Sequence, residues 1–164
     1  MDTPNVSVET ENAQFSQFLT FELAGEAYGV DILKVQEIKG FEPVRELPEA
    51  PRHIKGIIDL RGTILPVMDL RERFGLERVE YTPTTVIIIL GLDGGEHVLG
   101  IVVDAVSDVL DVRPDAIRPP PSLGAANRAR YIAGILPGKQ MTMLLNVDEL
   151  LSERDWDSLG DRIS

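Results

Sequence analysis

The chain has 164 residues, of which 43% are hydrophobic and 26% are charged, with a net charge of −11 and no cysteine. This length predicts one domain, or two small halves that share a core, and the apolar content is enough to build that core. The lack of cysteine excludes disulfides and thiolate metal sites. The negative charge argues against nucleic acid and anionic membranes as partners.

Residues 1–14 are polar and acidic, and they contain neither the basic nor the apolar segment of a secretory signal. We expect them to form a disordered acidic arm. No apolar run reaches the roughly 18 residues needed to cross a bilayer. A cytoplasmic protein without direct membrane insertion is therefore expected.

Alternating or continuous apolar runs predict a series of short strands. In chain order these strands cover residues 18–23, 28–32, 54–60, 63–68, 85–90, 98–103, 131–136 and 141–145. Glycine-containing turns follow three of them, at 24–26, 61–62 and 93–95. Proline-rich loops are predicted at 46–52 and 118–130.

Two cap-like residues predict helices. Asp69 precedes "LRERFG" and can cap a short helix that Gly75 ends. Asn146 precedes "VDELLSERDWDSL", in which apolar residues recur at helical spacing. The sequence therefore predicts a second helix after Asn146, and assigns residues 152–164 to a C-terminal helix or tail packed on the preceding domain.

The second half of the chain repeats the order of features of the first. Residues 28–38 align with 99–109, and "IKGI" at 54–57 aligns with "IAGI" at 132–135. This order predicts two small β-barrels packed face to face around one core, because neither half alone would bury enough surface. We place these two subdomains at about 15–80 and 81–151, with strand exchange between them possible.

Catalytic and metal-binding patterns are not found in the sequence. The two histidines, His53 and His97, are not in a metal-ligand spacing, and no nucleophile elbow or phosphate-binding loop occurs. Acids that suggest a carboxylate pair stand instead at predicted strand ends and caps: Asp31, Asp59, Asp69 and Asp104. The sequence thus predicts a protein that is not an enzyme and that has no cofactor and no metal.

Arg61 is the charged residue that most needs an explanation, because it stands with Gly62 between two aliphatic strands. One interpretation is structural: Gly62 adopts a positive φ and Arg61 is a solvated turn residue. The other is functional: a rigid turn presents the guanidinium so that it can bind a carboxylate of a partner protein through two hydrogen bonds.

Several motifs together resemble the CheW family of bacterial chemotaxis coupling proteins. They are "FLTFELAGEAYGVDILKVQEIKG", "LPEAPRHIKGIIDLRGTILPVMDLRERFG" and "GIVVDAVSDVL", and the resemblance covers roughly residues 17–151. It implies a mainly β fold: two five-stranded barrels of the Src-homology-3 (SH3) type around a shared hydrophobic core, with short helices and a C-terminal helix. The longer proteins that carry this module, CheV and CheA, have further domains that are absent from this sequence.

The resemblance also implies a function: an adaptor that links the cytoplasmic tips of methyl-accepting chemoreceptors to the regulatory domain of the histidine kinase CheA in receptor arrays. It suggests that six residues lie at or near partner-binding surfaces: Val35, Glu37, Gly56, Arg61, Val102 and Val103. By pattern alone the three valines also fit core strands, and Gly56 fits a close-packing glycine. The rival interpretations of the whole chain are a barrel that senses a small ligand without catalysis, and a structural scaffold subunit.

Overall fold

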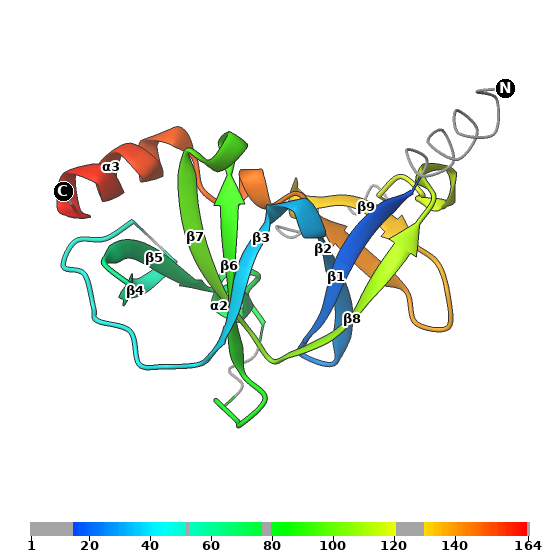
Figure 1. Ribbon diagram of the computed structural model, residues 1–164, viewed down its shortest axis with the longest axis horizontal. Helices are drawn as coiled ribbons and strands as arrows, with labels where there is room; N and C mark the ends of the chain where they lie inside the picture. The colour runs from blue at the N-terminus through cyan, green and yellow to red at the C-terminus, as the bar shows by residue number, and fades with distance from the viewer. Residues whose placement is uncertain (1–14, 52, 77–79, 121–129, 164) are drawn as a thin grey trace, which may run out of the picture.

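The computed structural model describes residues 15–51, 53–76, 80–120 and 130–163. The predicted acidic arm, residues 1–14, and most of the predicted loop at 118–130 lie outside these ranges. The described residues form two five-stranded sheets that lie side by side along the long axis of the molecule (Figure 1). This arrangement confirms the mainly β fold with two small barrel-like subdomains.

Each sheet is assembled from strands far apart in the sequence. The first barrel has the order β8-β1-β2-β10-β9, with strands β1 (Ser16–Leu23), β2 (Glu26–Asp31), β8 (Ala105–Val112), β9 (Ile132–Leu136) and β10 (Thr142–Leu145). The second barrel has the order β3-β6-β7-β5-β4, with strands β3 (Val35–Gly40), β4 (Ile54–Leu60), β5 (Thr63–Asp69), β6 (Val86–Leu92) and β7 (His97–Val103). In both barrels one pair is parallel, β2 with β10 and β5 with β7, and the other pairs are antiparallel.

The two barrels have the same topology once the strands are numbered within each repeat. If each strand is exchanged with the equivalent strand of the other repeat, β1 with β6, β2 with β7 and so on to β5 with β10, the strand order of one sheet becomes that of the other. Each barrel therefore contains two strands of one repeat and three of the other. The sheets do not divide at one point near residue 80. Strands are exchanged between the two halves, the possibility left open from the sequence, because the short link η1 (Ile32–Lys34) leads the chain out of the first barrel and into the second.

The helical segments are short and mostly follow strands. They are η1, α2 (Leu70–Arg73), η2 (Asp93–Gly95), η3 (Pro114–Ala116), η5 (Val147–Glu149) and α3 (Glu153–Ile163). The predicted cap at Asp69 is confirmed, because its side chain accepts a hydrogen bond from the backbone N–H of Arg71. The predicted cap at Asn146 is wrong, because its side chain makes no capping hydrogen bond. A single 3-10 turn follows it, and α3 begins only at Glu153, so the helix starts later than predicted.

The start of α3 is set by a reciprocal cap that the sequence analysis missed. The backbone N–H of Asp155 donates to the hydroxyl of Ser152 at 3.1 Å, and the N–H of Ser152 donates to the carboxylate of Asp155 at 3.1 Å. This exchange satisfies the orphan N–H groups of a helix terminus. Leu159, on α3, is buried in the shared core, so the helix is anchored against the second barrel, where Figure 1 shows it.

Each barrel is closed by a backbone bridge beyond its edge strand. In the second barrel the chain that follows β3 returns at Arg45 to pair with Ile57 on β4, with N–H···O distances of 3.0 and 2.8 Å. In the first barrel Arg118 pairs with Ile135 on β9 in the same way, at 2.8 and 2.9 Å. These bridges join the opposite edges of each sheet, which leaves fewer unpaired backbone groups on the edge strands.

The position of strand β6 between two hydrophobic cores explains why its sequence is an almost unbroken aliphatic run. Ile88 and Leu90 face a large core that both sheets share, whereas Ile87 and Ile89 face a smaller core inside the second barrel. A strand with two buried faces has no polar positions to alternate with. The shared core contains buried side chains from both barrels, so neither barrel is complete without the other.

Candidate docking surface

The turn between β4 and β5 holds Arg61 at the surface in a rigid conformation. Leu60 pairs with Thr63, which leaves a two-residue loop in which both residues have positive φ, 50° at Arg61 and 89° at Gly62. Two positive φ values are typical of a type I′ hairpin turn. The N–H of Gly62 donates to the carboxylate of Asp59 at 2.8 Å, which stabilises the turn. The predicted positive φ of Gly62 is confirmed.

Arg61 has a carboxylate partner within this chain. Its Nη1 and Nη2 atoms donate to the two carboxylate oxygens of Glu37 on β3, at 3.2 and 2.5 Å. The Arg61 side chain is 72% exposed and that of Glu37 is 30% exposed. Barrel closure brings the turn and β3 together. The two charged residues that the resemblance suggested therefore form one surface unit, which we call the Glu37–Arg61 pair.

This pair perturbs the titration of both groups. The hydrogen bonds from Arg61 lower the pKa of Glu37, and the same contacts raise the pKa of Arg61. Because the folded-state pKa of Glu37 is lowered, the pair stabilises the fold above the unfolded-state pKa of a glutamate, and this contribution is lost as pH falls through the lowered value. The contribution is small because the pair is exposed and screened by water.

Replacing Arg61 by glutamine is expected to return the pKa of Glu37 toward the value of an ordinary glutamate. Glutamine can still donate one hydrogen bond, but it carries no charge to stabilise the carboxylate. The measurement is an NMR titration of the Glu37 side-chain carboxyl carbon in wild type and Arg61→Gln. An identical midpoint in both proteins would show that the two side chains are not paired in solution.

Two of the suggested contact residues cannot touch a partner in this structure. Val102 and Val103 on β7 are fully buried. β7 lies between β6 and β5, so Val102 packs inside the second barrel and Val103 packs in the shared core. Their assignment to a contact surface is corrected accordingly: they are core residues.

Val35 and Gly56 both contribute to the packing of the fold. Val35 begins β3, two residues from Glu37, and is a partly buried side chain against the shared core. Gly56 is buried on β4, and a Cβ atom at this position would overlap the carbonyl oxygen of Arg45 in the bridge that closes the barrel. The glycine is therefore required for close backbone approach, the structural alternative considered for it.

Exposed apolar side chains form the part of the surface that the sequence analysis missed. Leu33 in η1 is 89% exposed, although an isolated leucine among strands would be expected in the core. Four of the other large exposed side chains occur in pairs that the repeat relates: Ile38 with Val109, and Ile64 with Met141. A comparison of the two halves position by position could have found these pairs, whereas Leu33 carries no such signal.

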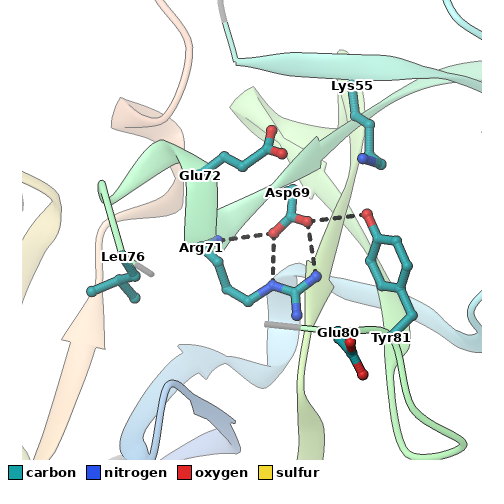
Figure 2. A pocket seen from close by; sticks show the side chains of 7 residues that line it. All are labelled: Lys55, Asp69, Arg71, Glu72, Leu76, Glu80 and Tyr81. Carbon is teal, nitrogen blue, oxygen red and sulfur yellow. Dashed lines mark hydrogen bonds and ion pairs between the residues drawn. The ribbon is translucent and has the colours of Figure 1, made fainter. Parts of the chain in front are cut away.

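A pocket of about 790 Å³ lies beside α2, outside the barrel interiors (Figure 2). Its polar lining consists of Lys55, Asp69, Arg71, Glu72, Glu80 and Tyr81. Asp69 accepts hydrogen bonds from Arg71 and, at 3.4 Å, from the hydroxyl of Tyr81, so these groups bind one another. The interior of the second barrel is filled by aliphatic side chains. The ligand-sensing alternative considered from the sequence calls for a cavity with converging polar groups, so it would use this pocket and not the filled interior of the barrel.

The described part of the chain contains neither a cluster of metal ligands nor a membrane-spanning helix. Within residues 15–51, 53–76, 80–120 and 130–163, no three His, Asp or Glu side chains are grouped so that they could hold a metal ion. No helix in the same ranges is long and apolar enough to cross a membrane.

These observations define a class: a double barrel of the SH3 type, closed by backbone bridges, that holds a charged pair and several apolar side chains at its surface. The family model for the CheW-like domain matches residues 17–155. The chain belongs to the CheW-like domain family.

Relatives match over nearly their whole length. The chemotaxis protein CheW of Klebsiella aerogenes is 43% identical over 140 residues, which covers 85% of this chain and 83% of the relative. The protein of the same name from Treponema pallidum is 32% identical to this chain, and the match covers 95% of this chain and 93% of the relative. The crystal structure of the scaffolding protein TtCheW from Thermoanaerobacter tengcongensis superposes with a TM-score of 0.76 and 33% identity, covering 85% of this chain and 90% of that one.

Proposed function

We propose that this protein is a chemotaxis adaptor that couples methyl-accepting chemoreceptors to the regulatory domain of the histidine kinase CheA, without catalysing a reaction. The observation that carries the proposal is the family match over residues 17–155, together with relatives named as chemotaxis proteins. We place the protein in the cytoplasm, recruited to membrane-associated receptor arrays. Its net charge of −11 makes nucleic acid an unfavourable partner.

Docking of rigid surfaces is the mechanism we propose. The Glu37–Arg61 pair forms part of a polar rim that sets the register and the choice of partner, and the receptor tip, a helical hairpin, docks beside it. Exposed apolar side chains such as Leu33 supply anchors, since a few desolvated residues carry most of the energy of an interface. Contacts that are weak one by one would be strengthened by multivalency in an array.

A charge swap tests the role of the Glu37–Arg61 pair. We expect Arg61→Glu to weaken co-sedimentation with receptor fragments while the fold is retained, because two carboxylates would then face each other on the docking surface. The double variant Glu37→Arg/Arg61→Glu restores the internal pair but exchanges its two ends. If the partner recognises the arginine itself, the swapped protein stays defective.

The matched control is Arg113→Glu, which reverses the charge of another exposed arginine, held near Asp115 at 3.5 Å. This control is expected to bind receptor fragments and the kinase regulatory domain as wild type does. Unchanged binding by Arg61→Glu would remove Arg61 from the docking surface. A wild-type chain that sediments with neither partner would contradict the adaptor function as a whole.

A further inference from the structure

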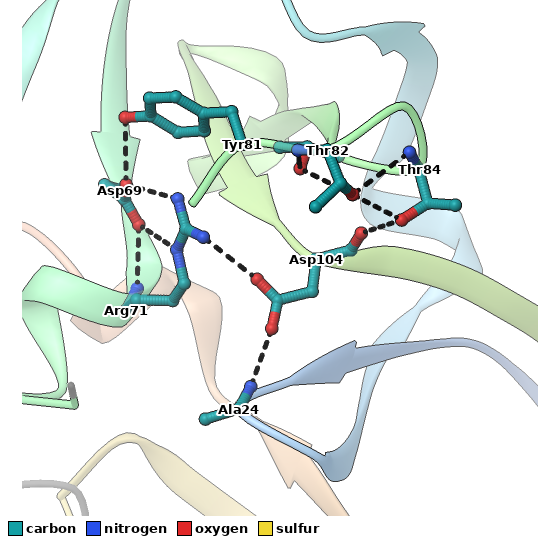
Figure 3. A network of polar contacts seen from close by, with 8 residues as sticks. Ala24, Asp69, Arg71, Tyr81, Thr82, Thr84 and Asp104 are labelled. Atoms are coloured by element: carbon teal, nitrogen blue, oxygen red, sulfur yellow. Dashed lines mark hydrogen bonds and ion pairs between the residues drawn. The ribbon is translucent and has the colours of Figure 1, made fainter. Parts of the chain in front are cut away.

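Asp104 lies at the point where the chain passes from β7 in the second barrel to β8 in the first (Figure 3). On the side of the first barrel, its backbone N–H donates to the carbonyl of Glu22 at 3.1 Å. Its Oδ2 atom accepts from the N–H of Ala24 at 2.8 Å. Ala24 has a positive φ of 52°, a conformation unfavourable for alanine, so this hydrogen bond also holds the β1–β2 turn in place.

The same residue is bound on the side of the second barrel. Its Oδ1 atom accepts from Nη1 of Arg71 at 3.1 Å, and its carbonyl accepts from the hydroxyl of Thr84 at 2.9 Å. Arg71 is only 3% exposed, and its Nε and Nη2 atoms donate to the two carboxylate oxygens of Asp69 at 3.0 and 2.9 Å. The buried guanidinium of Arg71 thus binds the carboxylates of both Asp69 and Asp104, and the Asp104 carboxylate also binds Ala24 of the first barrel.

The helix that carries Arg71 also connects the barrels by apolar packing. Phe74 directly follows α2, and its ring lies 5.8 Å from that of Tyr28 on β2 and 5.8 Å from that of Tyr131, just before β9. Apolar packing is non-directional. The two-pronged hydrogen bonding of Arg71 to Asp69 lies within the second barrel and fixes the orientation of the guanidinium, which reaches Asp104 through one further, directional hydrogen bond.

We propose that Asp69, Arg71 and Asp104 are positioning residues that form an inter-barrel joint. The shared apolar core holds the two barrels together, and the joint selects one angle between them. Because exposed apolar side chains lie on both barrels, such as Ile38 on β3 and Val109 on β8, the joint sets how a contact made on one barrel reaches the other. This last step rests on the proposed adaptor function, whereas the selection of an angle does not.

Pulsed electron paramagnetic resonance distances test the joint directly. The chain has no cysteine, so Thr63→Cys, at the exposed start of β5 in the second barrel, and Lys139→Cys, in the exposed loop between β9 and β10 of the first, place one spin label on each barrel. We expect a single narrow distance distribution in the otherwise wild-type chain. Asp104→Asn, which removes the charge that binds Arg71, is expected to broaden or shift it. The matched control Asp115→Asn, at an exposed carboxylate near Arg113, is expected to leave it unchanged.

An unchanged distribution in folded Asp104→Asn would overturn the joint. If circular dichroism shows that this variant does not fold, Thr84→Val decides the question. It removes the hydroxyl that donates to the Asp104 carbonyl and that also contacts the hydroxyl of Thr82, and we expect it to broaden the distribution less. A wild-type distribution in folded Thr84→Val, with Asp104→Asn unfolded, would show that the network serves folding and does not set an angle.

A reconstituted receptor–kinase assembly tests the consequence for signalling. Asp104→Asn is expected to bind each partner separately as wild type does, while receptor control of kinase activity falls by about fivefold or more, a typical size for coupling between sites. If receptor control of the kinase is unchanged in Asp104→Asn while the spin-label distance is altered, the link between the joint and signalling is overturned, but the joint itself is not. A wild-type chain that binds neither partner would instead refute the adaptor function, and the distance measurement would still decide the joint.

Discussion

Gly56→Ala is expected to destabilise the fold by about 3 kcal/mol, the upper end of the range for overpacked sites. A methyl group at this position would overlap the backbone carbonyl of Arg45, which itself accepts the hydrogen bond that closes the second barrel. Neither the added Cβ atom nor the Arg45 carbonyl can move away by a side-chain rotation, because both are fixed by the backbone. The free energy of unfolding, measured by urea denaturation, checks the expectation.

Two other glycines provide a graded control. Gly40→Ala, at the end of β3, adds a methyl group that meets no atom within 4 Å, and its effect is expected to be within about 0.5 kcal/mol. Gly134→Ala, at the equivalent closure of the first barrel, is expected to destabilise the fold by an intermediate amount, because its nearest contact is the Cγ2 methyl group of Ile117 at 2.5 Å and the backbone carbonyl of Arg118 lies farther away, at 3.2 Å. Equal stability of all three variants would contradict the role of the bridge.

Arg71→Met is expected to destabilise the protein by about 3–5 kcal/mol, as when one partner of a buried ion pair is removed. Methionine approximates the aliphatic part of arginine, but it leaves the Asp69 carboxylate, 4% exposed, without the guanidinium that binds both its oxygens. In wild type those hydrogen bonds raise the pKa of Arg71, so the guanidinium stays charged in its buried position.

The double variant Asp69→Asn/Arg71→Met separates the unpaired charge from the loss of packing. Asparagine caps a helix as well as aspartate does, so α2 keeps its cap while the buried charge disappears. We expect the double variant to be more stable than Arg71→Met alone. Arg113→Met, which breaks an exposed pair, should change stability by less than about 0.5 kcal/mol. Arg71→Met as stable as this control would contradict a buried ion pair.

Local patterns in the sequence predicted most of the strands because each depends on a few neighbouring residues. The segment at 54–60 is a strand with the predicted bounds, and the turn at 61–62 and the cap at Asp69 are where they were expected. Strands β3 and β8 were missed. In β3 the apolar Ile38 is exposed whereas the charged Glu37 and Lys39 are on the less exposed face, and in β8 Val109 and Asp111 are both exposed, so neither strand has the usual alternation of buried apolar and exposed polar residues.

The candidate docking surface was predictable only in part. Glu37 and Arg61 were singled out separately, but nothing in their spacing of 24 residues indicates that they bind each other. Val102 and Val103 were placed on a surface, although the burial of both faces of β7 depends on which strands flank it. Leu33 was missed because a single apolar residue has the same signal in a core as at an exposed turn.

The sequence by itself determined the alternation of apolar residues, the glycine turns and the cap at Asp69, because each of these depends on a few neighbouring residues. It also determined the repeat, because two stretches with the same order of features can be compared without knowing how they fold. Only the tertiary structure decided which repeat completes which barrel, how Gly56 permits closure, and that Arg71 joins carboxylates 35 residues apart, Asp69 and Asp104. The physical reason is that pairing between distant strands depends on the packing of the whole core, to which no local pattern refers.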